Sequence, residues 1–263
     1  MPRRMSLRSL AFAATFAVST TAYAQAISIT NAGFEADVIP DGAFSVFVPT
    51  GWQTYDPFGI IDQNANAVGV IRPNVAQDYF PGGAPEGDQA ALVFLAGNAS
   101  GPAGLQQTLT STLAAQTRYT LSVEVGNIAS GTSLVGSSDG GNLFYDLDGF
   151  PGYSIELLAG NTLLGADSSS AGSIPEGQWR RATLTVSSTN FGDVLGQPLT
   201  IRLVNLDMPG TPAAPAIEVD FDAVSLVAAP VPEPGTVALW LAGLGLLGSL
   251  TRRKRQPWVA TQG

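Results

Sequence analysis

The amino-acid sequence predicts an all-β fold in which the central part of the chain forms a β-sandwich. Three segments, residues 118–125, 182–186 and 199–203, alternate polar and apolar residues, which is typical of strands with one buried and one solvated face. Clusters of Gly, Pro, Asn and Asp lie between such segments and mark turns. No stretch of the central part has a sustained helical period. Many short strands joined by turns indicate two packed sheets.

Two other segments of the central part have a different character. Residues 89–95 are apolar on both faces of the expected strand, which favours a central position in a sheet. Residues 126–152 are rich in Gly, Ser and Asp. We interpret this second segment as a long surface loop, the kind of connection that often carries function.

The N-terminal residues predict a secretory signal peptide. Three arginines precede an apolar run at residues 10–18, and a small-x-small motif, Ala22-Tyr23-Ala24, follows it. The apolar run is too short to cross a membrane, as expected of a signal peptide. We therefore expect signal peptidase to remove residues 1–24, so that the mature chain begins at Gln25.

The predicted domain, residues 25–229, is long enough to bury a hydrophobic core and is strongly acidic. It holds five arginines against twenty Asp and Glu residues, a balance that the basic ends of the chain conceal. A body with this charge does not bind nucleic acid by neutralising phosphates. Divalent cations, or solubility on a crowded cell surface, suit it better.

The chain contains neither cysteine nor histidine. Disulfides, thiol chemistry and thiolate metal sites are therefore excluded. The Ser-His-Asp arrangement, imidazole general-base chemistry and His-ligated zinc are excluded as well. Any catalysis has to rest on carboxylates, Tyr, Ser or a bound metal.

The C-terminal residues have the layout of a membrane-held sorting tail. The run at residues 237–250 is apolar and about 14 residues long, shorter than the ~20 residues that usually span a membrane. Snorkelling of basic side chains and bilayer thinning compensate for part of this difference. We predict one transmembrane helix over residues 236–251 with its basic end in the cytoplasm. The alternative, a buried C-terminal helix of a soluble domain, fits less well because charges cap only one end.

This tail resembles the PEP-CTERM sorting signal. The residues that carry the resemblance are Pro232, Glu233 and Pro234 before the apolar run and Arg252, Arg253, Lys254 and Arg255 after it. The resemblance covers residues 230–256, and residues 257–263 form a short extension beyond it. It implies that an exosortase is a partner and cleaves near the Pro-Glu-Pro motif. The protein would then be exported, held transiently in the inner membrane, and left at the cell surface, the outer membrane or outside the cell.

The body resembles the galactose-binding-like jelly roll of many carbohydrate-binding modules. The matching segments are Asn31-Ala32-Gly33-Phe34-Glu35, Gly51-Trp52, residues 85–92, Leu105-Gln106-Gln107, Tyr119-Thr120-Leu121 and residues 219–226. In that fold the N-terminal Glu and the Asp of the last strand often share a structural calcium ion. The resemblance therefore implies Glu35 and Asp222 as metal ligands, joined by backbone carbonyls because calcium takes six to eight oxygens.

The pattern around Asp222 gives the calcium hypothesis some support from the residues themselves. The apolar phase is set by Val219 and Phe221 before Asp222 and by Val224 and Leu226 after it. A period of two cannot shift by one residue without a bulge or kink, and such a bulge could aim Asp222 at an ion. The alternative is that both acids are simply solvated at strand ends.

Sugar binding would require exposed aromatic side chains with polar neighbours. Tyr55, Tyr79 and Tyr145 are the candidate ligand-binding residues, because nothing in their surroundings commits them to a core. Trp52 and Trp179 fit better as core residues. A sandwich fold alone does not select a ligand.

Three functions compete at this point. The first is a non-catalytic surface or matrix protein, associated with exopolysaccharide, biofilm or the cell envelope as PEP-CTERM proteins often are. The second is a carbohydrate-binding module for an extracellular polysaccharide. The third is a glycoside hydrolase, which needs two carboxylates about 5 to 9.5 Å apart. Because the sequence offers no acid pair at a recognisable spacing, we expect a protein that is not an enzyme and has no catalytic residues.

Overall fold

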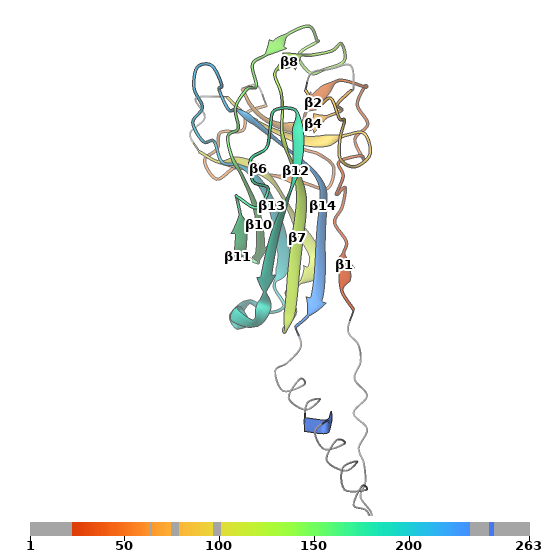
Figure 1. Ribbon diagram of the computed structural model, residues 1–263, viewed down its shortest axis with the longest axis vertical. Helices are drawn as coiled ribbons and strands as arrows, with labels where there is room; N and C mark the ends of the chain where they lie inside the picture. The colour runs from red at the N-terminus through yellow and green to blue at the C-terminus, as the bar shows by residue number, and fades with distance from the viewer. Residues whose placement is uncertain (1–22, 64, 75–78, 97–100, 232–241, 245–263) are drawn as a thin grey trace, which may run out of the picture.

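Two antiparallel sheets face each other in the body of the protein (Figure 1). The computed structural model describes residues 23–63, 65–74, 79–96, 101–231 and 242–244. Both ends of the body, strand β1 and the end of strand β14, lie at the lower end in Figure 1, while β2, β4 and β8 lie at the upper end. The chain therefore enters and leaves the body at the end opposite those strands.

The larger sheet has seven strands in the order β12-β7-β14-β5-β4-β2, with β1 paired to β14. Its strands are β1 (Gln25–Ile27), β2 (Phe44–Val46), β4 (Asn66–Ile71), β5 (Ala90–Leu95), β7 (Thr117–Asn127), β12 (Gln178–Ser187) and β14 (Glu218–Pro230). β14 is central: it pairs with β7 along nearly its whole length, and with β5 and then β1 on its other edge.

The smaller sheet has five strands in the order β11-β10-β13-β6-β3. Its strands are β3 (Gln53–Tyr55), β6 (Ala103–Thr112), β10 (Tyr153–Ala159), β11 (Thr162–Asp167) and β13 (Pro198–Asn205). A short hairpin of β8 (Gly131–Thr132) and β9 (Phe144–Tyr145) lies outside both sheets, and two 3-10 turns span Ser188–Asn190 and Gly192–Val194.

The main core fills the space between the two sheets. Val219 and Phe221 of β14 and Ile155 and Leu157 of β10 are all fully buried there. These residues alternate with outward-facing neighbours, as the period of two in a strand requires. Trp52 is buried as expected from the sequence and donates from Nε1 to the carbonyl of Asn31 at 3.0 Å.

A second, smaller core covers the outer face of the seven-stranded sheet at its upper end. It contains Ile71 of β4, Leu92 of β5, and Tyr79, Ile128 and Leu147 from the connecting segments. The sheet is therefore buried on both faces in this region. This double burial explains why residues 90–95 are apolar at successive positions.

The structure confirms the all-β sandwich and corrects one detail. Within residues 23–231 as described, the helices are the two 3-10 turns of three residues. Residues 126–152 lie mostly outside strands, as expected of a long loop, but they also continue β7, form the β8–β9 hairpin and contribute buried side chains such as Ile128 and Leu147. The reason is that this segment closes over the outer sheet face.

Most of the predicted signal peptide and of the predicted transmembrane helix lies outside the described residues. Residues 242–244 are the described part of the apolar run, and they are helical. Among the residues that the structure describes, none of the helices has the length and apolar character needed to cross a membrane.

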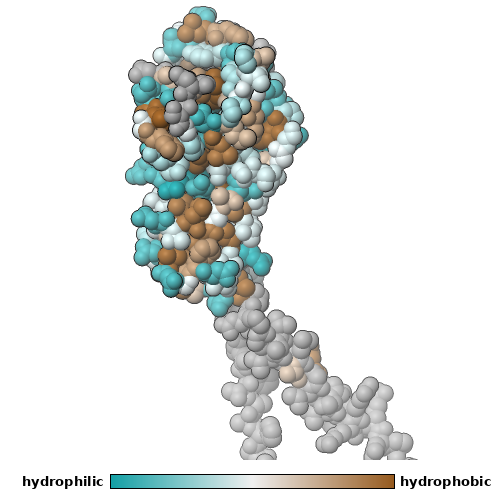
Figure 2. Space-filling view, turned by 90° about the vertical axis from the view of Figure 1, so that its left-hand side faces the viewer, coloured by the Kyte–Doolittle hydropathy of each residue, from teal (hydrophilic) through white to brown (hydrophobic). Residues whose placement is uncertain are grey.

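Figure 2 shows hydrophobic and hydrophilic side chains interspersed over one side of the body. Exposed apolar side chains include Phe58, Val135, Phe144 and Leu163. Scattered apolar residues of this kind are normal on a protein surface, so the core carries the stability.

Two phenylalanine substitutions test this assignment of the core. Phe221→Ala, at a side chain that is 0% exposed, should lower the free energy of unfolding by about 3–5 kcal/mol because a cavity remains between the sheets. Phe144→Ala, at a side chain that is 68% exposed, should change it by less than about 0.5 kcal/mol. Urea unfolding of both variants measures the difference, and equal effects would contradict the assignment.

Candidate active site

A cavity of about 270 Å³ lies on the outer face of the seven-stranded sheet, within the second core. Strands β2, β4, β5 and β14 supply one side of its lining, and the segment from Ile128 to Leu147 supplies the other. Its volume is near the lower end of the ~300–1,000 Å³ of small-molecule pockets. It combines apolar walls with a few polar groups, the usual composition of a ligand site.

Aromatic side chains form much of the cavity lining. The Tyr145 ring meets the rings of Phe44 and Phe94 edge to face, with centroid distances of 5.8 and 6.5 Å. Tyr79 lies beneath Gly131, where an added Cβ would sit 2.6 Å from the tyrosine ring. The absence of a side chain at Gly131 thus allows the hairpin to approach Tyr79 closely. These contacts fix the rings as rigid walls.

Glu218, the first residue of β14, presents a carboxyl group to this cavity. Because Val219 and Phe221 point into the main core, the alternation of the strand places Glu218 and Asp220 on the opposite face. Glu218 is only 5% exposed. Burial raises its pKa to about 8. Glu218 is therefore a carboxylic acid that carries its proton at neutral pH.

Asp220 lies beside Glu218 and is completely buried. Neither of its carboxyl oxygens receives a hydrogen bond from a donor within the described part of the chain. Burial, followed by the charge of the neighbouring Glu218, raises the pKa of Asp220 well above its ordinary value. An ionised carboxylate without donors is very costly to bury, so this pair retains protons at neutral pH.

Asp139 supplies a second polar group from the hairpin side of the cavity. Its carboxylate accepts hydrogen bonds from Ser133 Oγ at 2.6 Å, Tyr145 Oη at 3.1 Å and the Gly141 backbone N–H at 2.9 Å. Burial, followed by the charge of Asp139 and this hydrogen bond, raises the pKa of Tyr145 to about 12. The Tyr145 hydroxyl therefore stays protonated and donates its hydrogen bond to Asp139.

The structure separates the three tyrosines that the sequence grouped as candidate ligand-binding residues. Tyr79 and Tyr145 both line the cavity, but Tyr79 is 3% exposed rather than freely exposed, because the hairpin covers it. Tyr55 lies on β3 in the other sheet, where the Arg202 guanidinium is 4.4 Å from its ring centroid. Two of the three are therefore neighbours and the third is remote.

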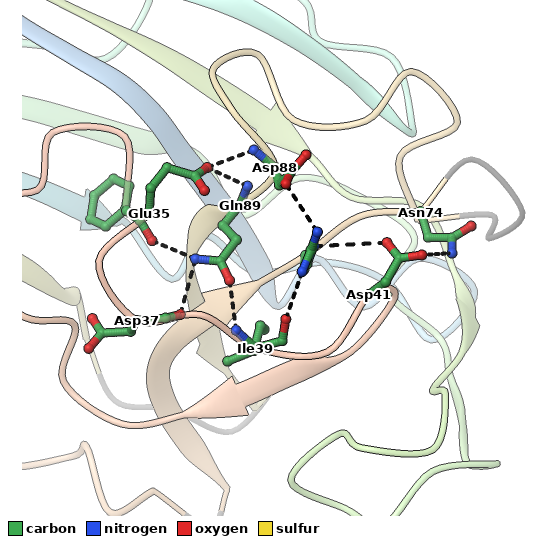
Figure 3. A network of polar contacts seen from close by, with 9 residues as sticks. Glu35, Asp37, Ile39, Asp41, Asn74, Asp88 and Gln89 are labelled. Atoms are coloured by element: carbon green, nitrogen blue, oxygen red, sulfur yellow. Dashed lines mark hydrogen bonds and ion pairs between the residues drawn. The ribbon is translucent and has the colours of Figure 1, made fainter.

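The predicted metal ligands lie on either side of the turn at residues 86–89. Glu35 Oε1 accepts the backbone N–H groups of Asp88 and Gln89, both at 2.7 Å, and the Gln89 side chain in turn bonds to the backbone of the loop that carries Glu35 (Figure 3). Asp222 Oδ2 accepts the N–H of Glu86 at 2.7 Å. Both acids therefore already stabilise this turn through hydrogen bonds.

The bulge expected at Asp222 is present. The pairing of β14 with β7 shifts between Asp222 and Ser225, and Ala223 has a φ of 49°. Burial is the main cause that raises the pKa of Asp222 to about 7, and the charges of Glu86 and Glu35 add to it. The atoms of Glu35 and Asp222 that would bind a metal are all carboxylate oxygens, which suits calcium. Within the described ranges, however, no three His, Cys, Asp or Glu side chains converge as ligands.

Sequence reasoning missed Glu218, Asp220 and Asp139 as site residues. A signal for the first two was present, because acids alternate with Val219 and Phe221 in one strand. The doubly apolar segment at residues 89–95 also predicted that the sheet is covered on both faces. Together these observations place the acids in a buried environment. Nothing in the local sequence distinguishes Asp139 from the other acids of its segment.

Comparison with protein families gives two matches. The HpiC1-like model, described as HpiC1 cyclase, matches residues 25–227. The PEP-CTERM protein-sorting motif matches residues 230–256. The predicted sorting signal is thus confirmed, and it marks the protein as an exosortase substrate that is exported and sorted to the cell envelope or surface. No curated protein matches the chain.

Solved structures of cyclases have the same fold. The apo form of a cyclase from Fischerella sp. is 37% identical, with a TM-score of 0.67, covering 80% of this chain and 98% of that one. The Stig cyclase Fisc from Fischerella sp. TAU, in complex with (3Z)-3-(1-methyl-2-pyrrolidinylidene)-3H-indole, is 39% identical, with a TM-score of 0.67 and coverage of 80% and 100%. A cyclase from Fischerella sp. TAU in complex with 4-(1H-indol-3-yl)butan-2-one is 38% identical, with the same TM-score and coverage.

These matches overturn the expectation of a non-catalytic protein. That expectation rested on the absence of two carboxylates at a hydrolase spacing, whereas the structure buries the neighbouring acids Glu218 and Asp220, with Glu218 in the lining of an aromatic cavity. The family model covers nearly the whole body, and the solved cyclases are similar over their full length. The chain therefore belongs to the HpiC1-like cyclase family.

Proposed function

We propose that the protein is an acid-dependent cyclase in which Glu218 is the general acid. The observation that carries this proposal is the Glu218 carboxyl group, which lines an aromatic cavity and has a pKa raised to about 8 by burial. A general acid works best when its pKa is near the operating pH. The chain has no His or Cys, so a carboxyl group is the natural proton donor.

The step that Glu218 performs is a proton transfer. The O–H bond of Glu218 breaks and a bond from hydrogen to a substrate carbon or nitrogen forms, which leaves a carboxylate and a substrate cation. Ring closure on that cation, followed by loss of a proton back to the carboxylate, regenerates the acid. The reaction is then an isomerisation that needs neither oxidant nor reductant. The rigid aromatic walls would exclude water and hold the reacting atoms together.

The substrate class that we propose is a neutral or cationic derivative of indole. Indole derivatives are the ligands in two of the similar cyclases. The four aromatic side chains Phe44, Tyr79, Phe94 and Tyr145 in the lining suit a flat ring. In the described part of the lining no arginine is present, which disfavours anionic substrates such as diphosphates.

We propose that the protein acts outside the cytoplasm, after removal of its signal peptide and transient passage through the inner membrane by its tail. The sorting motif supports this placement. The body ends at the opposite end from β2 and β4, which line the cavity (Figure 1). Cleavage of the tail would therefore leave the cavity unaltered. An association with exopolysaccharide or biofilm stays a prediction.

We also propose that calcium binds at Glu35 and Asp222 and stabilises the turn at residues 86–89. The raised pKa of Asp222 supports this, because a nearby cation would offset both the burial of its carboxylate, which is the main cause of the shift, and the repulsion from Glu86 and Glu35. Backbone carbonyls would complete the coordination. This ion would stabilise the fold and would take no part in the reaction.

Substitution of the acid tests the catalytic proposal. Glu218→Gln keeps the shape of the side chain but cannot deliver a proton, and should lower kcat about 100- to 10,000-fold on an indole substrate that the wild type cyclises. Glu156→Gln, on β10 of the other sheet, is the matched control and should retain wild-type turnover. Product formation by liquid chromatography measures both. Full activity of Glu218→Gln would exclude Glu218 as the acid.

The pH dependence of the reaction gives a second test. Because Glu218 donates only when protonated, kcat/KM should be constant below a pKa of about 8 and fall about tenfold per pH unit above it. The residual activity of Glu218→Gln should lack this alkaline decline. A rate that already declines near the ordinary carboxyl value, about pH 4, would contradict the assignment.

Thermal unfolding tests the calcium proposal. Saturating calcium should raise the midpoint of unfolding by about 5–10 °C relative to chelator, because the ion binds only the folded protein. Glu35→Gln and Asp222→Asn should each abolish the rise, and Asp193→Asn, on the 3-10 turn Gly192–Val194, should retain it. A midpoint that calcium does not change would exclude these ligands.

A further inference from the structure

The cavity contains a second carboxylate that the proposed proton transfer does not use. Asp139 lies on the hairpin side, whereas Glu218 belongs to β14. Three donors, Ser133 Oγ, Tyr145 Oη and the Gly141 N–H, hold the Asp139 carboxylate at 2.6, 3.1 and 2.9 Å. These charge-assisted hydrogen bonds fix the position of the carboxylate, and its negative charge is one of the causes that raise the pKa of Tyr145 in the same cavity. The cavity therefore has one fixed negative charge before any substrate binds.

No positive side chain balances this charge among the described residues of the lining. The body has five arginines and no lysine or histidine. Three of those arginines, Arg72, Arg181 and Arg202, form their ion pairs with other acids of the described chain. An uncompensated carboxylate in a partly apolar cavity attracts a cation more strongly than it would in water.

Two other features of the lining suit a cationic ring. The faces and edges of Phe44, Phe94 and Tyr145 form an aromatic wall, and aromatic faces attract cations. The Tyr79 hydroxyl is buried, and no hydrogen-bond partner reaches it within the described residues. A buried hydroxyl without a partner is unusual in a folded protein, and a ligand in the cavity that Tyr79 lines would be able to form a hydrogen bond with it.

We infer that the cavity binds a planar heteroaromatic cation, with the Asp139 carboxylate as its counter-ion. This inference rests on the proposed function, because proton transfer from Glu218 turns a neutral substrate into such a cation. After that transfer the cation lies near two carboxylates, the new one on Glu218 and the fixed one on Asp139. Asp139 would thus stabilise the charged state that precedes ring closure, while the hairpin donors keep it in place.

The experiment compares two isosteric probes, 1-methylquinolinium and 1-methylnaphthalene, by calorimetric binding to the full chain. The two ligands have the same shape and differ in charge. Wild type should bind the cation at least about tenfold more tightly than the neutral ring. Asp139→Asn should remove this preference and leave binding of the neutral ring within about twofold of wild type. Asp193→Asn, which alters an acid outside the cavity, should behave as wild type.

The outcomes separate this inference from the proposed function. Binding of the neutral ring without any preference for the cation in wild type would overturn the counter-ion role and leave the acid role of Glu218 standing. Equal weakening of both probes by Asp139→Asn would show that Asp139 only supports the hairpin, and would overturn the inference too. If wild type bound neither probe, both the cavity assignment and the counter-ion role would fall.

Discussion

The site depends on burial of both faces of the seven-stranded sheet. One face packs against the smaller sheet, and the other is covered at its upper end by the segment that includes β8 and β9. Where this cover is present, a strand of the sheet places a carboxyl group in a low-dielectric environment on either face. Glu218 and Asp220 therefore retain protons that solvated acids would lose. The raised pKa that the proposed proton transfer needs is therefore a result of this burial, and it is reached with ordinary Glu and Asp side chains.

Two different parts of the fold supply the cavity residues: the rigid sandwich and the segment that covers its outer face. The main core between the sheets fixes β14 through Val219 and Phe221, so the position of Glu218 is set by the sandwich itself. The cover contributes the other groups, including Asp139 and Tyr145. Site residues on strands are positioned more precisely than residues on loops, which suits an acid that must reach one atom of its substrate.

The sequence predicted the elements whose cause is local. Alternation of polar and apolar residues predicted strands, and the two ends of the chain predicted export and sorting. The shift in the apolar pattern at Asp222 predicted the bulge that the structure has. It did not predict the cavity, because the burial of Glu218 depends on a segment more than 70 residues earlier in the chain. Tyr79 was misplaced for the same reason, since its cover, Gly131, is a long-range contact. The enzymatic role was therefore not visible in any local motif.

The bulge after Asp222 explains why the row of buried acids on β14 ends there. Glu218, Asp220 and Asp222 share one face of the strand, and all three are nearly or completely buried. Beyond the bulge, Val224 and Leu226 return to the main core while Ser225 is exposed. The cover of the outer face has ended at this point, so an acid further along would be solvated and would have an ordinary acidity. The register shift therefore separates an upper part of the strand, which places buried acids on the outer face, from a lower part that packs only against the smaller sheet.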